Sequence, residues 1–148
     1  MKTRTFTIIK PDAVAGGYTG KILDMILADG FTIRAMKMTF MNRNDAARFY
    51  AVHRGKPFFE ALSTYMTSGA IVVALLEGED AVDSLRRLVG ATDPRNADEG
   101  TIRRMFGTDL TRNAIHASDC AENAEKEWKQ FFDEKEIVEV DYSPCSFE

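Results

Sequence analysis

The sequence is poor in the residues that build metal sites and disulfide scaffolds. It contains two cysteines, Cys120 and Cys145, and two histidines, His53 and His116. The cysteines form no Cys-x-x-Cys pair, and the cysteines and histidines together lack the spacing of a zinc site. We therefore expect neither a structural metal nor a disulfide, and we interpret both cysteines as free thiols without a role.

Long hydrophobic runs are also lacking. No stretch approaches the roughly 20 apolar residues that a membrane-spanning helix requires. The first residues, MKTRTFTIIKPD, have neither the apolar core nor the cleavage site of a signal peptide. Linkers, internal repeats and low-complexity tracts are missing as well. We expect a cytoplasmic protein without a membrane partner, folded as one domain over residues 1–148.

An excess of positive charge is missing too, because 19 basic and 23 acidic residues give a net charge of −4. This balance argues against broad adhesion to nucleic acids or membranes. Within residues 86–112, however, every basic residue is an arginine, whose planar guanidinium suits paired contacts with phosphate oxygens. These residues are Arg86, Arg87, Arg95, Arg103, Arg104 and Arg112. Two interpretations stay open at this point, a locally bound anion and a set of solvated surface charges.

Familiar catalytic motifs are absent from the sequence. The segment GGYTGKI resembles a phosphate-binding P-loop, but Gly16 and Gly20 are one residue too close, and Ile22 replaces the hydroxyl residue that binds magnesium. We interpret Gly20 and Lys21 as the start of a helix instead. The sequence also lacks the motifs G-x-S-x-G, H-E-x-x-H and G-x-G-x-x-G. These absences leave His116 as the main catalytic candidate.

Hydrophobic periodicity predicts an α+β fold. Strands are expected at 3–10, 31–40, 70–77 and 113–117, the third of them buried on both faces. Helices are expected at 18–30, 42–55, 80–90 and 118–132, with a short helix beginning at Pro57 and a single turn at 101–106. This order indicates a ferredoxin-like split β-α-β fold, a four-stranded antiparallel sheet with helices packed mainly on one side.

Three local features accompany these elements. Thr19 is a candidate cap for the first long helix. The apolar parity of the second strand changes near Met36, which predicts a β-bulge there. Asp119 and Glu122 have the spacing of a capping box for the last helix.

The stretch RNAIHASD, residues 112–119, places His116 at the end of a strand and just before a helix. Histidine is a nucleophile near neutral pH when one ring nitrogen is free and the other is held by an acceptor. Glu127 lies about two helical turns beyond Asp119, where its carboxylate could face the imidazole, and Ser118 could steady either group. A structural histidine is the alternative that the residues alone leave open.

The segment NAIHASD resembles the active-site signature of nucleoside diphosphate kinases, Asn-x-x-His-[Gly/Ala]-Ser-Asp. The resemblance covers nearly the whole chain. Other segments follow in the order and spacing of that family, namely TFTIIKPDAV, FYAVHRGKPFF, YMTSGAIVVALLEG, LVGATDPRNADEGTIR and ENAEKEW. Several such matches in order are much more specific than any one of them.

The resemblance implies a reaction. Members of the family transfer the γ-phosphoryl group of a nucleoside triphosphate to a nucleoside diphosphate, by a ping-pong route through phosphohistidine and with broad base specificity. It implies that His116 attacks through Nδ1, that Glu127 holds Nε2 and that Ser118 supports Glu127. It also implies Mg²⁺ held mainly by the nucleotide phosphates, without dedicated protein ligands. The expected assembly is a homo-oligomer, with a hexamer favoured and a tetramer as the alternative.

The resemblance also implies a nucleotide site. Lys10 and Asn113 match residues that bind the ribose hydroxyls, with Lys10 near the phosphate as well, and Tyr50 matches a residue beside the catalytic histidine. The phosphates are expected to contact Arg86, Thr92 and Arg103. The base is expected to stack on Phe58, in a slot lined by Leu62 and Leu110. The other four arginines and His53 match no site residue, and we interpret them as structural or surface residues.

The sequence departs from the family pattern in the loop around Glu99 and in TIRRMF, which leaves the type of oligomer open. Two other interpretations are weighed against the kinase. A ferredoxin-like binding module would account for the fold alone, but an RNA platform needs a basic, aromatic sheet face that TFTIIK and AIVVALLE do not supply. The second is a relative of the kinases that has lost catalysis.

Overall fold

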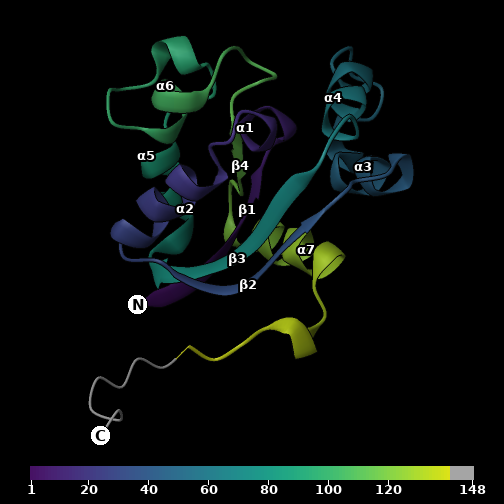
Figure 1. Cartoon of the computed structure of the whole chain (residues 1–148). Coiled ribbons are helices and arrows are strands. Elements are labelled where there is room, and N and C mark those ends of the chain that lie inside the picture. The colour runs from purple at the N-terminus through teal and green to yellow at the C-terminus, as the bar shows by residue number, and fades with distance from the viewer. Residues whose placement is uncertain (141–148) are drawn as a thin grey trace, which may run out of the picture.

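The predicted four-stranded antiparallel sheet is present in the computed structural model, which describes residues 1–140 (Figure 1). Its strand order is β2-β3-β1-β4. The strands are β1 (Lys2–Ile9), β2 (Thr32–Thr39), β3 (Ile71–Glu79) and β4 (Ile115–Ala117). The predicted positions of all four strands are therefore confirmed to within a few residues.

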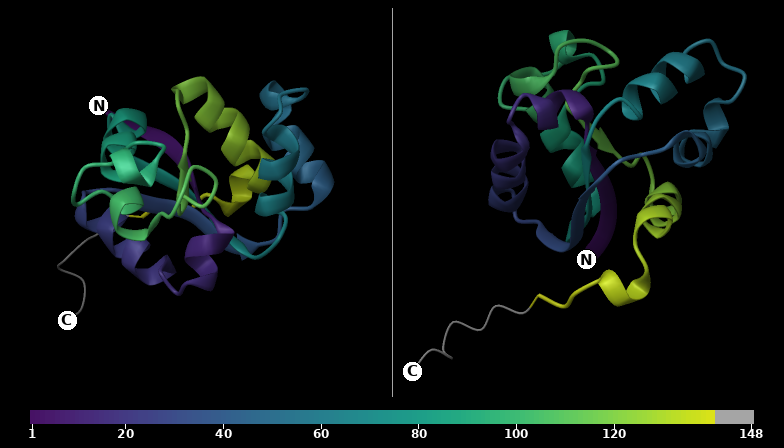
Figure 2. Two further views of the ribbon diagram at one scale, coloured as in Figure 1. Left: turned by 90° about the horizontal axis from the view of Figure 1, so that it is seen from above. Right: turned by 45° about the vertical axis from the view of Figure 1, so that its right-hand side comes forward.

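The helices cover both faces of the sheet, so the prediction that they lie mainly on one side is wrong (Figure 2). One face packs against α1 (Pro11–Ala15), α2 (Thr19–Ala28), α5 (Ala81–Val89) and α6 (Ile102–Phe106). The other face packs against α3 (Arg43–Phe49), α4 (Phe59–Met66) and α7 (Ala121–Phe131). The physical reason lies in β1 and β3, whose side chains are buried alternately in the two apolar clusters, so each cluster needs its own helices.

The central strand β3 follows from its composition. Its residues Ile71 to Leu76 form a continuous apolar run, and every one of them is buried. Val72 and Val73 pack into opposite clusters, as successive residues of a strand must. The strand therefore holds the two halves of the core together, as the sequence indicates.

The N-terminal ends of three helices differ from the predictions. Pro11 opens the short helix α1, which was not predicted between the first strand and the helix expected at 18–30. Thr19 is the first residue inside α2 and does not cap it, since Tyr18 occupies the cap position without a side-chain bond. At α7 the cap is Cys120, whose Sγ accepts a hydrogen bond from the backbone N–H of Asn123, so the predicted box of Asp119 and Glu122 does not form.

Other boundaries shift by a few residues. The bulge of β2 lies between Ile33 and Ala35 rather than near Met36. The helix expected at 42–55 ends at Phe49, and a 3₁₀ turn, Ala51–His53, follows it. The next helix begins at Phe59 rather than at Pro57.

The segment after α7 returns to the outer strand β2 (Figure 1). The buried guanidinium of Arg34 binds this segment, because its Nε donates to the carbonyl of Val138 at 2.5 Å. Its Nη1 donates to Glu77 on the neighbouring strand β3 at 2.8 Å. Cys145 lies outside the described residues, and Cys120 is a free thiol. Among residues 1–140, no helix is both long and apolar enough to cross a membrane.

The short strand β4 lies at the other edge of the sheet and carries His116. It pairs with β1 in a register that sets His116 opposite Ile8, and the hydroxyl of Thr7 donates to the carbonyl of His116 at 2.7 Å. The chain then turns at Ser118, whose N–H donates to the carbonyl of Phe6, and enters α7. This path brings α7 back across β1 and beside the histidine.

Candidate active site

A cavity of about 630 Å³ opens in front of His116. Of the twelve residues that the sequence predicts for the site, the structure places eleven on its wall. They are Lys10, Tyr50, Phe58, Leu62, Arg86, Thr92, Arg103, Leu110, Asn113, His116 and Glu127. The twelfth, Ser118, is fully buried behind Glu127. Residues from 10 to 127 thus meet in one site, although they are scattered over most of the chain.

The imidazole of His116 is held at one nitrogen. Its Nε2 lies 2.8 Å from Oε1 of Glu127 on α7. The same carboxylate oxygen accepts a hydrogen bond from the hydroxyl of Ser118 at 2.7 Å. A carboxylate can only accept from the ring, so Nε2 carries the proton and Nδ1 keeps its lone pair when the ring is neutral. The arrangement therefore leaves one nitrogen free for chemistry.

The ring is also held by packing. Phe49 meets it edge-on, with ring centroids 5.1 Å apart. About 21% of the His116 side chain is still exposed, so the ring is reachable from the cavity. Tyr50 lies next to it on the cavity wall, and burial, together with the nearby charge of Glu127, raises the pKa of its hydroxyl above the ordinary value. Tyr50 therefore stays protonated at working pH.

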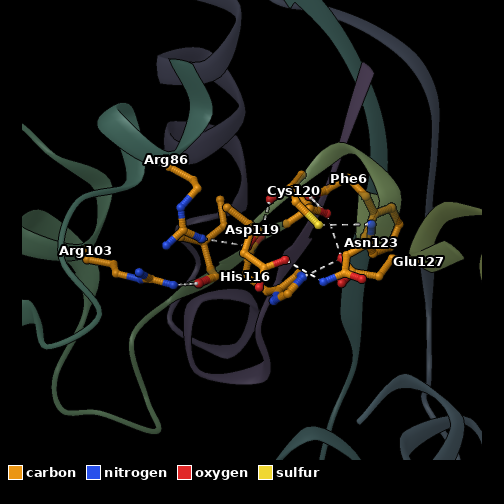
Figure 3. Close-up of polar contacts among 12 residues, drawn as sticks. Phe6, Arg86, Arg103, His116, Asp119, Cys120, Asn123 and Glu127 are labelled. Atoms are coloured by element: carbon orange, nitrogen blue, oxygen red, sulfur yellow. Dashed lines mark hydrogen bonds and ion pairs between the residues drawn. The ribbon is translucent and has the colours of Figure 1, made fainter. Parts of the chain in front are cut away.

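Two arginines approach His116 from the side opposite Glu127 (Figure 3). Nη2 of Arg103 donates to the carbonyl of Ile115 at 2.9 Å, and Nη1 of Arg86 donates to the carbonyl of Ala117 at 3.5 Å. The carbonyls on either side of His116 therefore orient both guanidiniums toward the same place. Among residues 1–140 neither arginine forms an ion pair.

The two charges act on each other. Burial, and then the charge of Arg86, lower the pKa of Arg103 to about 10. Nε of Arg103 is buried and has no hydrogen-bond partner within the described part of the chain. Arg86 is exposed and Arg103 is partly buried, and two like charges this close repel each other unless an anion joins them. The pair is therefore suited to bind an anionic group directly in front of His116.

The remaining arginines of the predicted cluster lie outside the cavity. Arg95 and Arg112 are neutralised by Asp93 and Asp109, at 2.8 and 3.0 Å. Arg87 donates to the hydroxyl of Ser84, and Arg104 donates to a main-chain carbonyl. Their positions agree with the interpretation of these four side chains as structural or surface residues.

Lys10 and Asn113 form the next part of the wall. Nζ of the buried Lys10 donates to Oδ1 of Asn113 at 2.7 Å, and Nδ2 of Asn113 donates to the carbonyl of Thr92 at 3.0 Å. Burial, and then the charge of Arg103, lower the pKa of Lys10 to about 8. Lys10, Arg86 and Arg103 thus supply positive charge to the cavity at neutral pH.

Backbone geometry at Ala114 and Gly90 supports this wall. Ala114, fully buried between Asn113 and β4, has a φ of +73°. A left-handed conformation costs a residue with a Cβ roughly 1–2 kcal/mol. Gly90 ends α5 with a φ of +90°, and a Cβ there would lie 2.6 Å from Oγ1 of Thr101. Its carbonyl accepts a hydrogen bond from Arg103, so this turn helps to orient the arginine.

The other end of the cavity is apolar and open. Phe58 and Leu110 are 48% and 58% exposed, so neither is a core residue, and the partly buried Leu62 lines the cavity while packing against the apolar core. Two apolar side chains that stand at the mouth of a cavity suit a flat aromatic ligand. The cavity thus has both apolar and positively charged lining residues, so it is amphipathic.

His53 was not among the predicted site residues. It lines the same cavity, with its ring edge-on to Phe58 at 5.1 Å, although it was interpreted as structural or surface. Phe49, Asp119 and Asn123 also line the cavity without having been predicted. The spacing of Phe49, Tyr50 and His53 within the predicted helix at 42–55 does not show which of these side chains would stay open to solvent.

The candidate metal ligands in the cavity are few. The carboxylate of Asp119 lies on the wall and accepts from Nδ2 of Asn123 at 2.7 Å, while Glu127 is engaged by His116 and Ser118. Within residues 1–140, no group of three or more histidine, cysteine, aspartate or glutamate side chains could hold a metal ion. Mg²⁺ commonly takes one or two carboxylates together with phosphate oxygens and water. The cavity therefore fits an ion that arrives on the phosphates of a ligand.

Comparison with known proteins agrees with this geometry. The family model "Nucleoside diphosphate kinase" matches residues 3–137. A nucleoside diphosphate kinase of Nitratiruptor sp. is 53% identical over 135 residues, which are 91% of this chain and 98% of that protein.

Two solved structures have the same fold. The nucleoside diphosphate kinase of Aquifex aeolicus is 46% identical, with a TM-score of 0.91 over 93% of this chain and 100% of that one. The halophilic enzyme of Halobacterium salinarum, solved in complex with CDP, is 38% identical, with a TM-score of 0.92 over 96% and 95%. The chain therefore belongs to the nucleoside diphosphate kinase family, whose members are nucleotide-binding phosphotransferases.

Proposed function

We propose that this protein transfers the γ-phosphoryl group of a nucleoside triphosphate to a nucleoside diphosphate through a phosphohistidine at His116. The observation that carries the proposal is the pairing of Nε2 with Glu127 at 2.8 Å, with Nδ1 left free in a cavity that also holds two unneutralised arginines. One side of the ring is held by an acceptor, and the other side faces an anion site. We also propose that the reaction takes place in the cytoplasm.

Each half-reaction is one phosphoryl transfer. The Nδ1 lone pair attacks the γ-phosphorus, an N–P bond forms, and the bond from that phosphorus to the β,γ-bridging oxygen breaks, which releases the diphosphate. A second diphosphate then attacks the phosphohistidine with a terminal oxygen and regenerates the free ring. The Nε2 proton remains with the ring throughout, because the Glu127 carboxylate stabilises the positive charge that grows on the imidazole.

Phosphoryl transfer depends mainly on positioning and on neutralising charge. Arg86 and Arg103 contact the oxygens of the transferred group, with Thr92 as a further contact. The repulsion between the two guanidiniums decreases when the anion binds. In other active sites, removal of one such electrostatic donor costs about 3 kcal/mol of barrier. Mg²⁺ would be held mainly by the nucleotide phosphates, with Asp119 as the carboxylate available on the cavity wall, and it would further neutralise the phosphate charge.

The rest of the nucleotide follows the polarity of the cavity. Lys10 and Asn113 bind the ribose hydroxyls, and Lys10 also lies near the phosphates. The base stacks on Phe58 between Leu62 and Leu110. Stacking on an aromatic face tolerates every base, because each base offers a π-face. The proposed enzyme is accordingly broad in its base specificity.

We expect that incubation with γ-labelled ATP and Mg²⁺ labels the protein on histidine. The label should be lost in acid, survive alkali and pass to any added nucleoside diphosphate, because an N–P bond is acid-labile and keeps high transfer potential. His116→Asn should take up no label, whereas His53→Asn, the matched control at the other histidine, should still be labelled. Label that enters and leaves the His116→Asn protein would contradict the assignment.

Glu127→Ala should slow phosphoryl transfer about 100-fold, since the imidazole loses the group that fixes its tautomer and stabilises its charge. Nucleotide affinity, measured by calorimetry, should change by less than about threefold, because Glu127 makes no contact with the proposed phosphate or base positions. Glu125→Ala is a suitable control, since this exposed residue of the same helix pairs only with Lys129. Unchanged turnover in Glu127→Ala would refute the supporting role.

Nucleotide binding should take up protons at slightly alkaline pH. The pKa of Lys10 is about 8 in the free protein, and a bound polyphosphate favours the charged ammonium, so binding raises that pKa. At pH 8 the expected uptake is about half a proton, and it should decrease toward pH 6.5, where Lys10 is already charged. Calorimetry in two buffers of different ionisation enthalpy measures it. The uptake should vanish in Lys10→Met and persist in the exposed-residue control Lys21→Met, and equal uptake in both would contradict the prediction.

We also propose that the protein is a homo-oligomer, with a hexamer favoured over a tetramer. Met36 and Met38 on the outer strand β2, and Phe40 just after it, are large apolar side chains exposed to solvent. An exposed, apolar edge strand favours pairing with another chain. Light scattering should give a mass near six times 16.6 kDa, and Phe40→Asp should lower it. A wild-type mass of 16.6 kDa would contradict the proposal.

A further inference from the structure

The side chain of Asp12, which does not line the cavity, joins three segments that carry the proposed nucleotide site. Its Oδ2 accepts a hydrogen bond from the N–H of Ala114 at 3.0 Å. Its Oδ1 accepts a short hydrogen bond from the hydroxyl of Tyr65, and that hydroxyl in turn accepts one from the Asp12 N–H at 2.7 Å. One carboxylate thus connects α1, α4 and the turn before β4.

The bond to Ala114 lies where the backbone is strained. Ala114 has a φ of +73° and is fully buried, and its carbonyl accepts from the N–H of Lys10 at 2.8 Å. Both main-chain polar groups of this left-handed residue are therefore bound by the segment Lys10–Asp12. Asn113 is the next residue toward the N-terminus, and its amide meets Nζ of Lys10. The direction of the Asn113 side chain thus depends on a turn that Asp12 holds.

The bond to Tyr65 extends the same anchor to the other end of the site. Tyr65 lies on α4, the helix that carries Leu62 and begins just after Phe58. Burial, and then the hydrogen bond to Asp12, raise the pKa of the Tyr65 hydroxyl above its ordinary value, so it remains a donor at working pH. The slot for the base and the turn for the ribose are therefore fixed to the same carboxylate.

We propose that Asp12 and Tyr65 are positioning residues, which hold Asn113 at the distance and angle from Phe58 that recognition of the ribose hydroxyls requires. This inference rests on the proposed contact of Lys10 and Asn113 with those hydroxyls. Neither Asp12 nor Tyr65 approaches the reacting atoms, so the pair acts on ribose recognition and leaves the chemistry at His116 unchanged.

The test compares ADP with 2′,3′-dideoxy-ADP, which lacks the ribose hydroxyls. Calorimetry gives both dissociation constants, and the value for 2′,3′-dideoxy-ADP is divided by the value for ADP. This ratio should fall about tenfold in Asp12→Ala and several-fold in Tyr65→Phe, a variant of nearly the same volume. Phosphorylation of His116 by phosphoramidate, a donor without a nucleoside, should stay within about twofold of wild type. The control Tyr18→Phe, on an exposed tyrosine, should change neither quantity.

A rescue variant separates positioning from general support of the fold. Glycine adopts a left-handed conformation without strain. If Asp12 acts by holding Ala114 in that conformation, adding Ala114→Gly to the Asp12→Ala protein should restore most of the wild-type ratio of the two dissociation constants. A merely structural loss would not be repaired by removing a buried methyl group.

Three outcomes would overturn the inference. They are an unchanged ratio in Asp12→Ala, a phosphoramidate rate that falls in step with affinity, and no recovery in the Asp12→Ala, Ala114→Gly protein. Failure of the proposed function looks different, because wild-type protein would then take no phosphoryl group onto His116 or would bind both diphosphates equally. If the wild-type protein is phosphorylated on His116 and binds ADP more tightly than 2′,3′-dideoxy-ADP, but Asp12→Ala and Tyr65→Phe leave the ratio unchanged, only the positioning role is refuted.

Discussion

The site depends on the contact between a ring nitrogen and a carboxylate. Nε2 of His116 meets Oε1 of Glu127 at 2.8 Å, and Ser118 donates to the same oxygen at 2.7 Å. The contact fixes which nitrogen carries the proton, and therefore which nitrogen can attack. The contact forms because His116 lies on β4 at the edge of the sheet and α7 packs back along β1. Most of the fold near this edge serves to keep those two elements in register.

A second constraint is the positive charge concentrated in the cavity. Burial, together with the charge of a neighbouring arginine, lowers the pKa values of Lys10 and Arg103 to about 8 and 10. The folded protein without its ligand therefore keeps like charges close together, at a cost to its stability. A polyphosphate relieves that repulsion. The same groups thus destabilise the free protein and create its affinity for the proposed substrate, as functional sites commonly do.

Much of the fold follows from local patterns, and the failures have identifiable causes. The apolar run of β3 is unambiguous, because a strand buried on both faces needs no alternation. The distribution of helices over two faces was missed, since a helical stripe shows that one side is buried but not against which face of the sheet. The cap at Cys120 was missed for a related reason, because the chain path before a helix decides which side chain can reach its first N–H groups.

The strands and the family could be predicted from local sequence alone, and so could the proposal of His116 as nucleophile, since NAIHASD and the alternating segments are local and their chemistry is intrinsic. The packed fold was needed to show which of six neighbouring arginines face the cavity, that His53 lines it, and that Asp12 accepts a hydrogen bond from the left-handed residue Ala114. Each of these depends on contacts between segments far apart in the chain. Spacing along a chain fixes which residues share an element, but the packing of elements fixes which side chains meet.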